Sequence, residues 1–112
     1  MGIAWALGAA PESILSLAPK SVTAPVAMGI SDKIGGLPSL TAVLVVLTGV
    51  LGAVFGTKVF RIMRITDDTV AGLAMGVTSH GIGTARAFQV SEQMGAFSGL
   101  AMALSALSLI HI

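Results

Sequence analysis

Residues 34–57 read IGGLPSLTAVLVVLTGVLGAVFGT and contain no charged side chain over 24 consecutive positions. As an α-helix this stretch would be roughly 36 Å long, at about 1.5 Å per residue. The hydrocarbon core of a bilayer is about 30 Å thick, so the stretch is long enough to cross it. We therefore predict a transmembrane helix here, opened by Pro38 and Ser39 after a turn at Gly35 and Gly36.

Two further uncharged intervals extend this pattern. Residues 93–112 are similar in length to the first interval, and residues 69–85 are marginal at 17 positions.

The chain has 112 residues, of which 10% are charged, against about 25% in a typical soluble domain. The alternative is a small soluble protein with residues 34–57 as its buried central helix. Such a short chain leaves most of its surface facing solvent, and this one has too few charges to stay dissolved. We expect an all-α, integral membrane helical bundle whose main partner is the lipid bilayer.

Basic residues predict how this bundle is oriented. Lys58, Arg61 and Arg64 follow the predicted span directly, and the positive-inside rule assigns that end to the cytoplasm. We expect a multi-pass protein of the cell (inner) membrane. The formal net charge of +1 is not arranged as a basic stripe, so nucleic acid is excluded as a partner. The absence of cysteine excludes disulfides.

One side of the predicted span is lined by small residues. Gly49, Gly52 and Gly56 fall on this side, and the last two form a Gly-x-x-x-Gly pair. Small side chains let a second helix approach closely. We assign these three glycines to helix packing, either within one protomer or between protomers.

Two prolines bracket a polar segment before the span. Between Pro19 and Pro25 lie Lys20, Ser21 and Thr23, and regular helical hydrogen bonding must be interrupted there. In lipid, such a break is tolerated only where protein or a water-filled cavity surrounds it. The alternative is a plain surface loop.

A second polar segment follows the span. Residues 69–89 contain four glycines within twelve positions, together with Ser79, His80, Thr84 and Arg86. In one continuous helix, Ser79, Gly83 and Arg86 would share a face, with His80 and Thr84 beside it. An arginine inside the membrane usually faces a cavity or a partner, so Arg86 marks either a binding site or an ordinary membrane boundary. Whether this segment crosses the membrane or re-enters stays open.

Several familiar motifs fail on inspection. Gly81-x-Gly83 begins like a dinucleotide fingerprint, but Arg86 stands where the third glycine is required and no strand precedes it. Adjacent Ser79 and His80 point about 100° apart on a helix and do not form a catalytic pair. A dedicated metal site lacks ligands, because His80 is the only credible histidine. We expect no enzyme, no catalytic residue, no cofactor and no metal.

Separate blocks of the chain, in one order, resemble the LrgB/CidB family. The segment from Pro19 to Ala27 is similar to the family's Pro-Lys-Ser-Val-Thr-x-Pro-Ile-Ala motif. The other blocks that look like this family are residues 34–42, 49–56, 78–87 and 92–100. The resemblance covers about residues 5–106 and implies the C-terminal half of an LrgB-like membrane domain, with an N-terminal half missing.

The resemblance implies two alternative functions. Some members look like transporters of small monocarboxylates of the pyruvate, glycolate and glycerate type. In that case the chain would be one half of an inverted-repeat transporter fold with broken (discontinuous) helices. Its substrate site would contain Lys20, Ser21, Thr23, Pro25, Ser79, His80, Gly81, Gly83, Thr84 and Arg86. His80 would carry a coupling proton, since histidine titrates near neutrality. Other members are antiholin-like regulators of murein hydrolase export and autolysis, which act through membrane oligomers with an LrgA/CidA-like partner or as homo-oligomers.

The last six residues depart from the family. Leu107 to Ile112 read LSLIHI, which matches the translation of a transposon end used in sequencing libraries. We expect residues 107–112 to be a sequencing-adapter artefact, and His111 is therefore left out of every site.

Overall fold

The computed structural model of this chain describes residues 1–110. The helices are α1 (Gly2–Ala6), α2 (Pro11–Leu17), α3 (Ala24–Ile34), α4 (Pro38–Ile62), α5 (Asp68–Val90) and α6 (Glu92–Ile110). Since no strand occurs in these described residues, the predicted all-α class is confirmed. His111 and Ile112, the end of the segment that we expect to be an artefact, lie outside the described residues, whereas residues 107–110 continue α6.

Proline explains where three of the helices begin. Pro11, Pro25 and Pro38 lie in the first turns of α2, α3 and α4, where a missing backbone N–H costs no helical hydrogen bond. The interruption predicted between Pro19 and Pro25 is present, because α2 ends at Leu17 and α3 begins at Ala24. The intervening residues form turns.

Two helices, α4 and α6, are long and apolar enough to cross a membrane. Only 17% of the apolar window of α4 and 22% of that of α6 are buried inside the protein. The bulky residues Val43, Leu47, Leu51 and Val54 of α4 are each about half exposed. The buried central helix of a soluble protein would show the reverse, so the soluble alternative is not supported.

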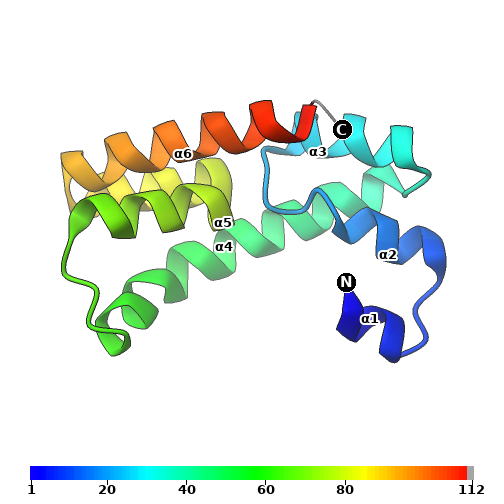
Figure 1. Cartoon of the computed structure of the whole chain (residues 1–112), viewed down its shortest axis with the longest axis horizontal. Coiled ribbons are helices and arrows are strands. Elements are labelled where there is room, and N and C mark those ends of the chain that lie inside the picture. Colours follow the sequence, from blue (N-terminus) through cyan, green and yellow to red (C-terminus); the bar gives the residue numbers. More distant parts are fainter. Residues whose placement is uncertain (111–112) are drawn as a thin grey trace.

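The α5 segment is two helical halves that lie antiparallel. His80 has φ 42° and ψ −134°, which lies outside the helical range, and it separates residues 68–79 from residues 81–90. Figure 1 shows the first half (green) running along α4 and the second half (yellow) returning beside it. Ser79, His80, Gly83 and Arg86 therefore do not occupy one continuous helix, and the shared faces expected for such a helix do not form.

Hydrogen bonds hold the two ends of α5 together. The Ser91 hydroxyl donates to the Asp68 carboxylate at 2.7 Å, and the Gln93 amide donates to the Thr69 hydroxyl at 2.8 Å. Ser91 and Gln93 follow the second half, whereas Asp68 and Thr69 open the first. The base of the α5 hairpin is thus closed, and its tip is the break at residues 79–81.

Glycines let the first half of α5 approach α6 closely. A Cβ atom at Gly76 would come within 2.9 Å of the Ser98 Cα atom, and one at Gly72 within 3.2 Å of the Met94 Cα atom. Both obstacles are backbone atoms, which side-chain rotation cannot remove. These two glycines set the distance between α5 and α6.

At the other end of α4, hydroxyl groups join α2, α3 and α4. The Thr41 hydroxyl donates to the Ser16 carbonyl at 3.0 Å and lies 2.7 Å from the Ser31 hydroxyl. The Ser16 hydroxyl also accepts from the Leu37 N–H at 2.7 Å. Ser16, Ser31 and Thr41 are completely buried. Buried polar groups with satisfied hydrogen bonds fix the geometry of α2 and α3 on α4.

Candidate functional site

The α5 tip is anchored to α4 by its histidine. The His80 Nε2 atom lies 2.8 Å from the Val45 carbonyl oxygen. Since a carbonyl oxygen only accepts hydrogen bonds, Nε2 carries the proton of the imidazole and donates it. A positive φ at a non-glycine residue costs about 1–3 kcal/mol and persists only where surrounding contacts hold it. The bond to Val45 is one of those contacts.

The glycine seam of α4 makes room for this tip. A Cβ atom at Gly49 would lie 2.8 Å from the His80 ring, and one at Gly52 would collide with the Ser79 side chain. At Gly56 the neighbour is the Met75 side chain, 2.7 Å from such a Cβ atom. The small residues assigned to helix packing thus receive α5 of the same protomer.

Hydroxyl groups bind the second half of α5 to the tip and to α6. The Thr84 hydroxyl donates to the His80 carbonyl at 2.8 Å and lies 2.8 Å from the Ser98 hydroxyl. Ser79, His80, Thr84 and Ser98 are all buried, with at most 8% of each exposed. The structure thus brings together three of the predicted residues and adds Ser98. Sequence reasoning missed Ser98, although its position between Gly95 and Gly99 marks it as part of a close helix contact.

The first polar segment lies against the same part of α4. Val22 is 1% exposed and packs in one cluster with Ala27 and Val45. Lys20 is half-buried, and its ammonium group donates to the Ser21 hydroxyl at 3.3 Å. Val45 is therefore a neighbour of both polar segments, through its side chain on one side and its carbonyl on the other.

Two predicted glycines also lie at the tip, where Gly81 is exposed and Gly83 is buried beside Ser79. The remaining predicted residues are more peripheral. Thr23 is half-buried and Pro25 is exposed at the start of α3. Arg86 is half-buried and donates to the Gln89 side chain at 3.0 Å. No hydrogen bond joins Arg86 or Lys20 to the α5 tip in the described part of the chain.

Within residues 1–110, every fully buried side-chain nitrogen or oxygen has a hydrogen-bond partner. The same part of the chain contains no group of three or more His, Cys, Asp or Glu side chains that could hold a metal ion. The tip is therefore a closed polar cluster inside an apolar bundle in this conformation. Its fully buried donors and acceptors are occupied by the protein itself.

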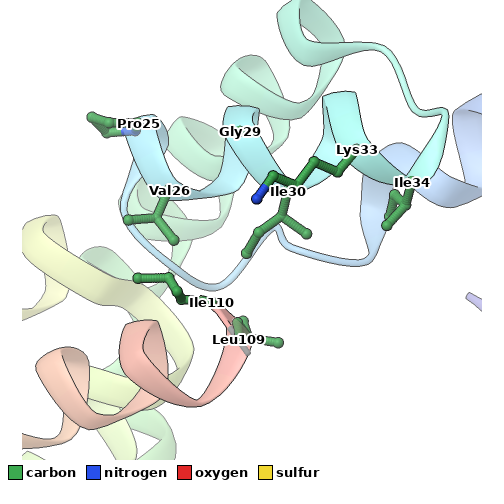
Figure 2. Close-up of a pocket in the computed structure, with 8 residues that line it drawn as sticks. All are labelled: Pro25, Val26, Gly29, Ile30, Lys33, Ile34, Leu109 and Ile110. Atoms are coloured by element: carbon green, nitrogen blue, oxygen red, sulfur yellow. The ribbon is translucent and has the colours of Figure 1, made fainter. Parts of the chain in front are cut away.

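Clefts occur at both ends of the bundle. Figure 2 shows one between α3 and the end of α6, lined by Pro25, Val26, Gly29, Ile30, Lys33, Ile34, Leu109 and Ile110. Lys33 is its only charged lining residue. Two of its other lining residues, Leu109 and Ile110, belong to the segment 107–112 that we expect to be an artefact. We therefore assign it no function. The cleft at the opposite end contains Arg61 and Arg64.

Long exposed apolar helices around a buried polar break define a helical membrane protein. The whole chain, residues 1–112, matches the LrgB-like family. This protein belongs to that family.

Curated relatives agree with this assignment. The chain is 46% identical over 92 residues to "Uncharacterized protein YwbG" of Bacillus subtilis, covering 82% of this chain and 41% of the relative. It is 35% identical over 101 residues to "Holin-like protein CidB" of Staphylococcus aureus, covering 90% of this chain and 44% of the relative. The chain thus spans less than half the length of these relatives. No solved structure matches it.

Proposed function

We propose that this chain forms one half of the translocation pathway of a secondary transporter for small monocarboxylates. The observation that carries the proposal is the α5 hairpin, whose polar tip is buried in the middle of an apolar bundle. Transporters place binding sites near the bilayer midplane, at broken helices whose termini face the substrate. Non-helical backbone at that depth is tolerated only in protein or beside a water-filled cavity.

The length of the hairpin agrees with such a depth. Its first half runs from Asp68 to Ser79, which corresponds to roughly 18 Å at about 1.5 Å per residue. Half of a bilayer core is about 15 Å. If the basic residues that follow α4 mark the membrane boundary, the tip lies near the midplane. We therefore propose that residues 69–89 re-enter and do not cross.

The tip offers groups suited to a carboxylate and a proton. Ser79 and Thr84 carry hydroxyl donors, and the second half of α5 begins at Gly81 with its positive dipole end toward the tip. His80 uses Nε2 for Val45, which leaves Nδ1 as the nitrogen that a coupling proton would occupy. In this proposal the substrate displaces internal hydrogen bonds of the tip.

Both polar segments belong to one site in this proposal because both contact Val45. Lys20 would balance the carboxylate charge from the first segment. Arg86 lies six residues from His80, roughly 9 Å along a helix, and would meet the anion on its way to the tip. The remaining walls would come from a second, inverted repeat in the longer relatives.

Substrate binding by a full-length relative in detergent tests the site, because the remaining walls come from the second repeat in this proposal. We expect saturable binding of radiolabelled pyruvate or glycolate, weakened about tenfold in the counterpart of Ser79→Ala, since a hydrogen bond to a charged group contributes about 1.5–3 kcal/mol. The counterpart of Lys33→Gln, at the opposite end of α3, is the matched control and should bind normally. Equal binding by both variants would contradict the site. In a full-length relative, the counterpart of Arg86→Ala should abolish saturable uptake.

The orientation is also testable, because the chain has no cysteine. We propose that α4 and α6 span the cell membrane and that the end carrying Lys58, Arg61 and Arg64 is cytoplasmic. A single cysteine introduced at the exposed Thr66 should react with a membrane-impermeant maleimide only in inverted vesicles. A cysteine at the exposed Ser39 should react only in intact cells. The opposite labelling pattern would reverse the topology.

A second function has its own support. The relatives named "Holin-like protein CidB" favour a regulator of murein hydrolase release that acts through membrane oligomers or with an LrgA/CidA-like partner. The outer face of α4, with Leu47, Leu51 and Val54 about half exposed, would be its contact surface. Gly52→Leu does not separate the two functions, since a side chain there strikes Ser79 within the protomer. Leu51→Trp separates the two functions, because Leu51 lies on the outer face of α4. Loss of autolysis control with normal substrate binding in this variant would favour the regulator.

A further inference from the structure

The cleft at the base of the α5 hairpin combines cations with an apolar floor. It lies where α4 ends, α5 begins and ends, and α6 begins, at the left end of Figure 1. Arg61, Arg64 and Asp68 are its charged residues. Its other lining residues are Thr57, Phe60, Ile65, Thr66, Ala71, Val90 and Met94. An amphipathic cleft of this composition suits a ligand with an anionic head and an apolar tail.

The carboxylates near this cleft are already engaged. Asp67 accepts a hydrogen bond from the Thr69 N–H at 2.8 Å, as the N-cap of α5. Asp68 accepts from the Ser91 hydroxyl at 2.7 Å and so closes the hairpin base. Both carboxylates have these structural roles, whereas the side chains of Arg61 and Arg64 remain exposed. The charged side chains that line the cleft are therefore two guanidinium groups and one carboxylate, which leaves a net positive charge.

The backbone at Arg64 is a second, independent observation. Arg64 has φ 58°, in the left-handed region that glycine adopts freely and arginine does not. Its N–H donates to the Arg61 carbonyl at 3.2 Å, and the next N–H, of Ile65, donates to the Phe60 carbonyl at 2.9 Å. These two bonds form the helix-ending motif in which glycine is usual. An arginine at this position is strained locally, and strained residues concentrate at functional sites.

We propose that this cleft binds an anionic phospholipid of the adjoining leaflet, with the phosphate between Arg61 and Arg64 and an acyl chain along Val90 and Phe60. Basic pockets between membrane helices bind such head groups. A free phosphate ion would use the two guanidinium groups alone and gain nothing from the apolar floor. The proposal does not depend on the transport function, since the cleft lies at the opposite end of the hairpin from the tip.

Native mass spectrometry of the whole chain in detergent tests the proposal. Phosphatidylglycerol, phosphatidylcholine and inorganic phosphate are the three probes. We expect one saturable phosphatidylglycerol site, and binding about fivefold weaker in Arg61→Gln and in Arg64→Gly, the factor that one basic residue contributes near an anionic lipid. Lys33→Gln, which removes a cation from the cleft at the other end, is the matched control and should leave binding unchanged.

Arg64→Gly is the decisive variant because glycine suits the backbone at this position. A loss of lipid binding in this variant cannot be attributed to unfolding, and the α-helical circular dichroism signal should confirm its fold. Equal binding of phosphatidylcholine would overturn the proposal, as would undiminished phosphatidylglycerol binding in Arg64→Gly. Full competition by millimolar inorganic phosphate would identify a free-anion site and would also contradict it.

Discussion

Replacement of Gly76 by alanine should separate α5 from α6 and destabilise the bundle. The added Cβ atom would lie 2.9 Å from the Ser98 Cα atom and 2.8 Å from its carbonyl carbon. Overpacking of this kind costs about 1–3 kcal/mol and is larger where only backbone can move. Alanine is favoured over glycine inside a helix by about 1 kcal/mol, which offsets part of this cost.

Gly29→Ala provides the matched control, because Gly29 is also helical but a Cβ atom there meets nothing within 4 Å. The control should gain the helix-propensity term of about 1 kcal/mol without a packing cost. We expect Gly76→Ala to unfold at lower SDS fraction than the unmodified chain and Gly29→Ala at higher, with a difference of about 2 kcal/mol. Circular dichroism during the SDS titration measures both. Equal stability of the two variants would refute the close α5–α6 approach.

Three further predictions concern the caps and the tip. Arg64→Gly should stabilise the chain by about 1 kcal/mol in the same titration, because it relieves a left-handed backbone; a destabilised variant would contradict this. His80→Gly should be more stable than His80→Ala by about 1 kcal/mol, since both lose the bond to Val45 but only alanine keeps the strained φ. Ser91→Ala should lose about 1–2 kcal/mol, because its hydroxyl both caps the Met94 N–H and holds Asp68. Hydrogen exchange at the α5 base should rise in that variant, and unchanged exchange would count against the closed hairpin.

The sequence predicts the apolar elements and the interrupted segment well, because each depends on local composition. The 24 uncharged residues before Lys58 demand a long helix, and Pro19 and Pro25 exclude a continuous one around Ser21. These features need no knowledge of distant contacts. The family resemblance, carried by short motifs, is confirmed over the whole chain.

The fold-back of α5 could not be predicted in the same way. Glycine is the residue expected at a reversal with positive φ, yet His80 takes that conformation while Gly81 beside it does not. The reversal depends on tertiary contacts that local patterns do not encode, namely the bond to Val45 and the space left by Gly49. The same limit explains why the role of Ser98 was missed, since its partner Thr84 lies on another helix.

Val45 touches both polar segments, and this shared neighbour has a mechanical consequence. Its carbonyl accepts a hydrogen bond from the His80 ring, and its side chain packs on Val22. One turn of α4 therefore contacts two otherwise separate segments of the chain. Any tilt of that turn carries the imidazole and the loop around Ser21 together. A bulkier or smaller side chain at position 45 would act directly on Val22, and on His80 only if the backbone carbonyl moves with it.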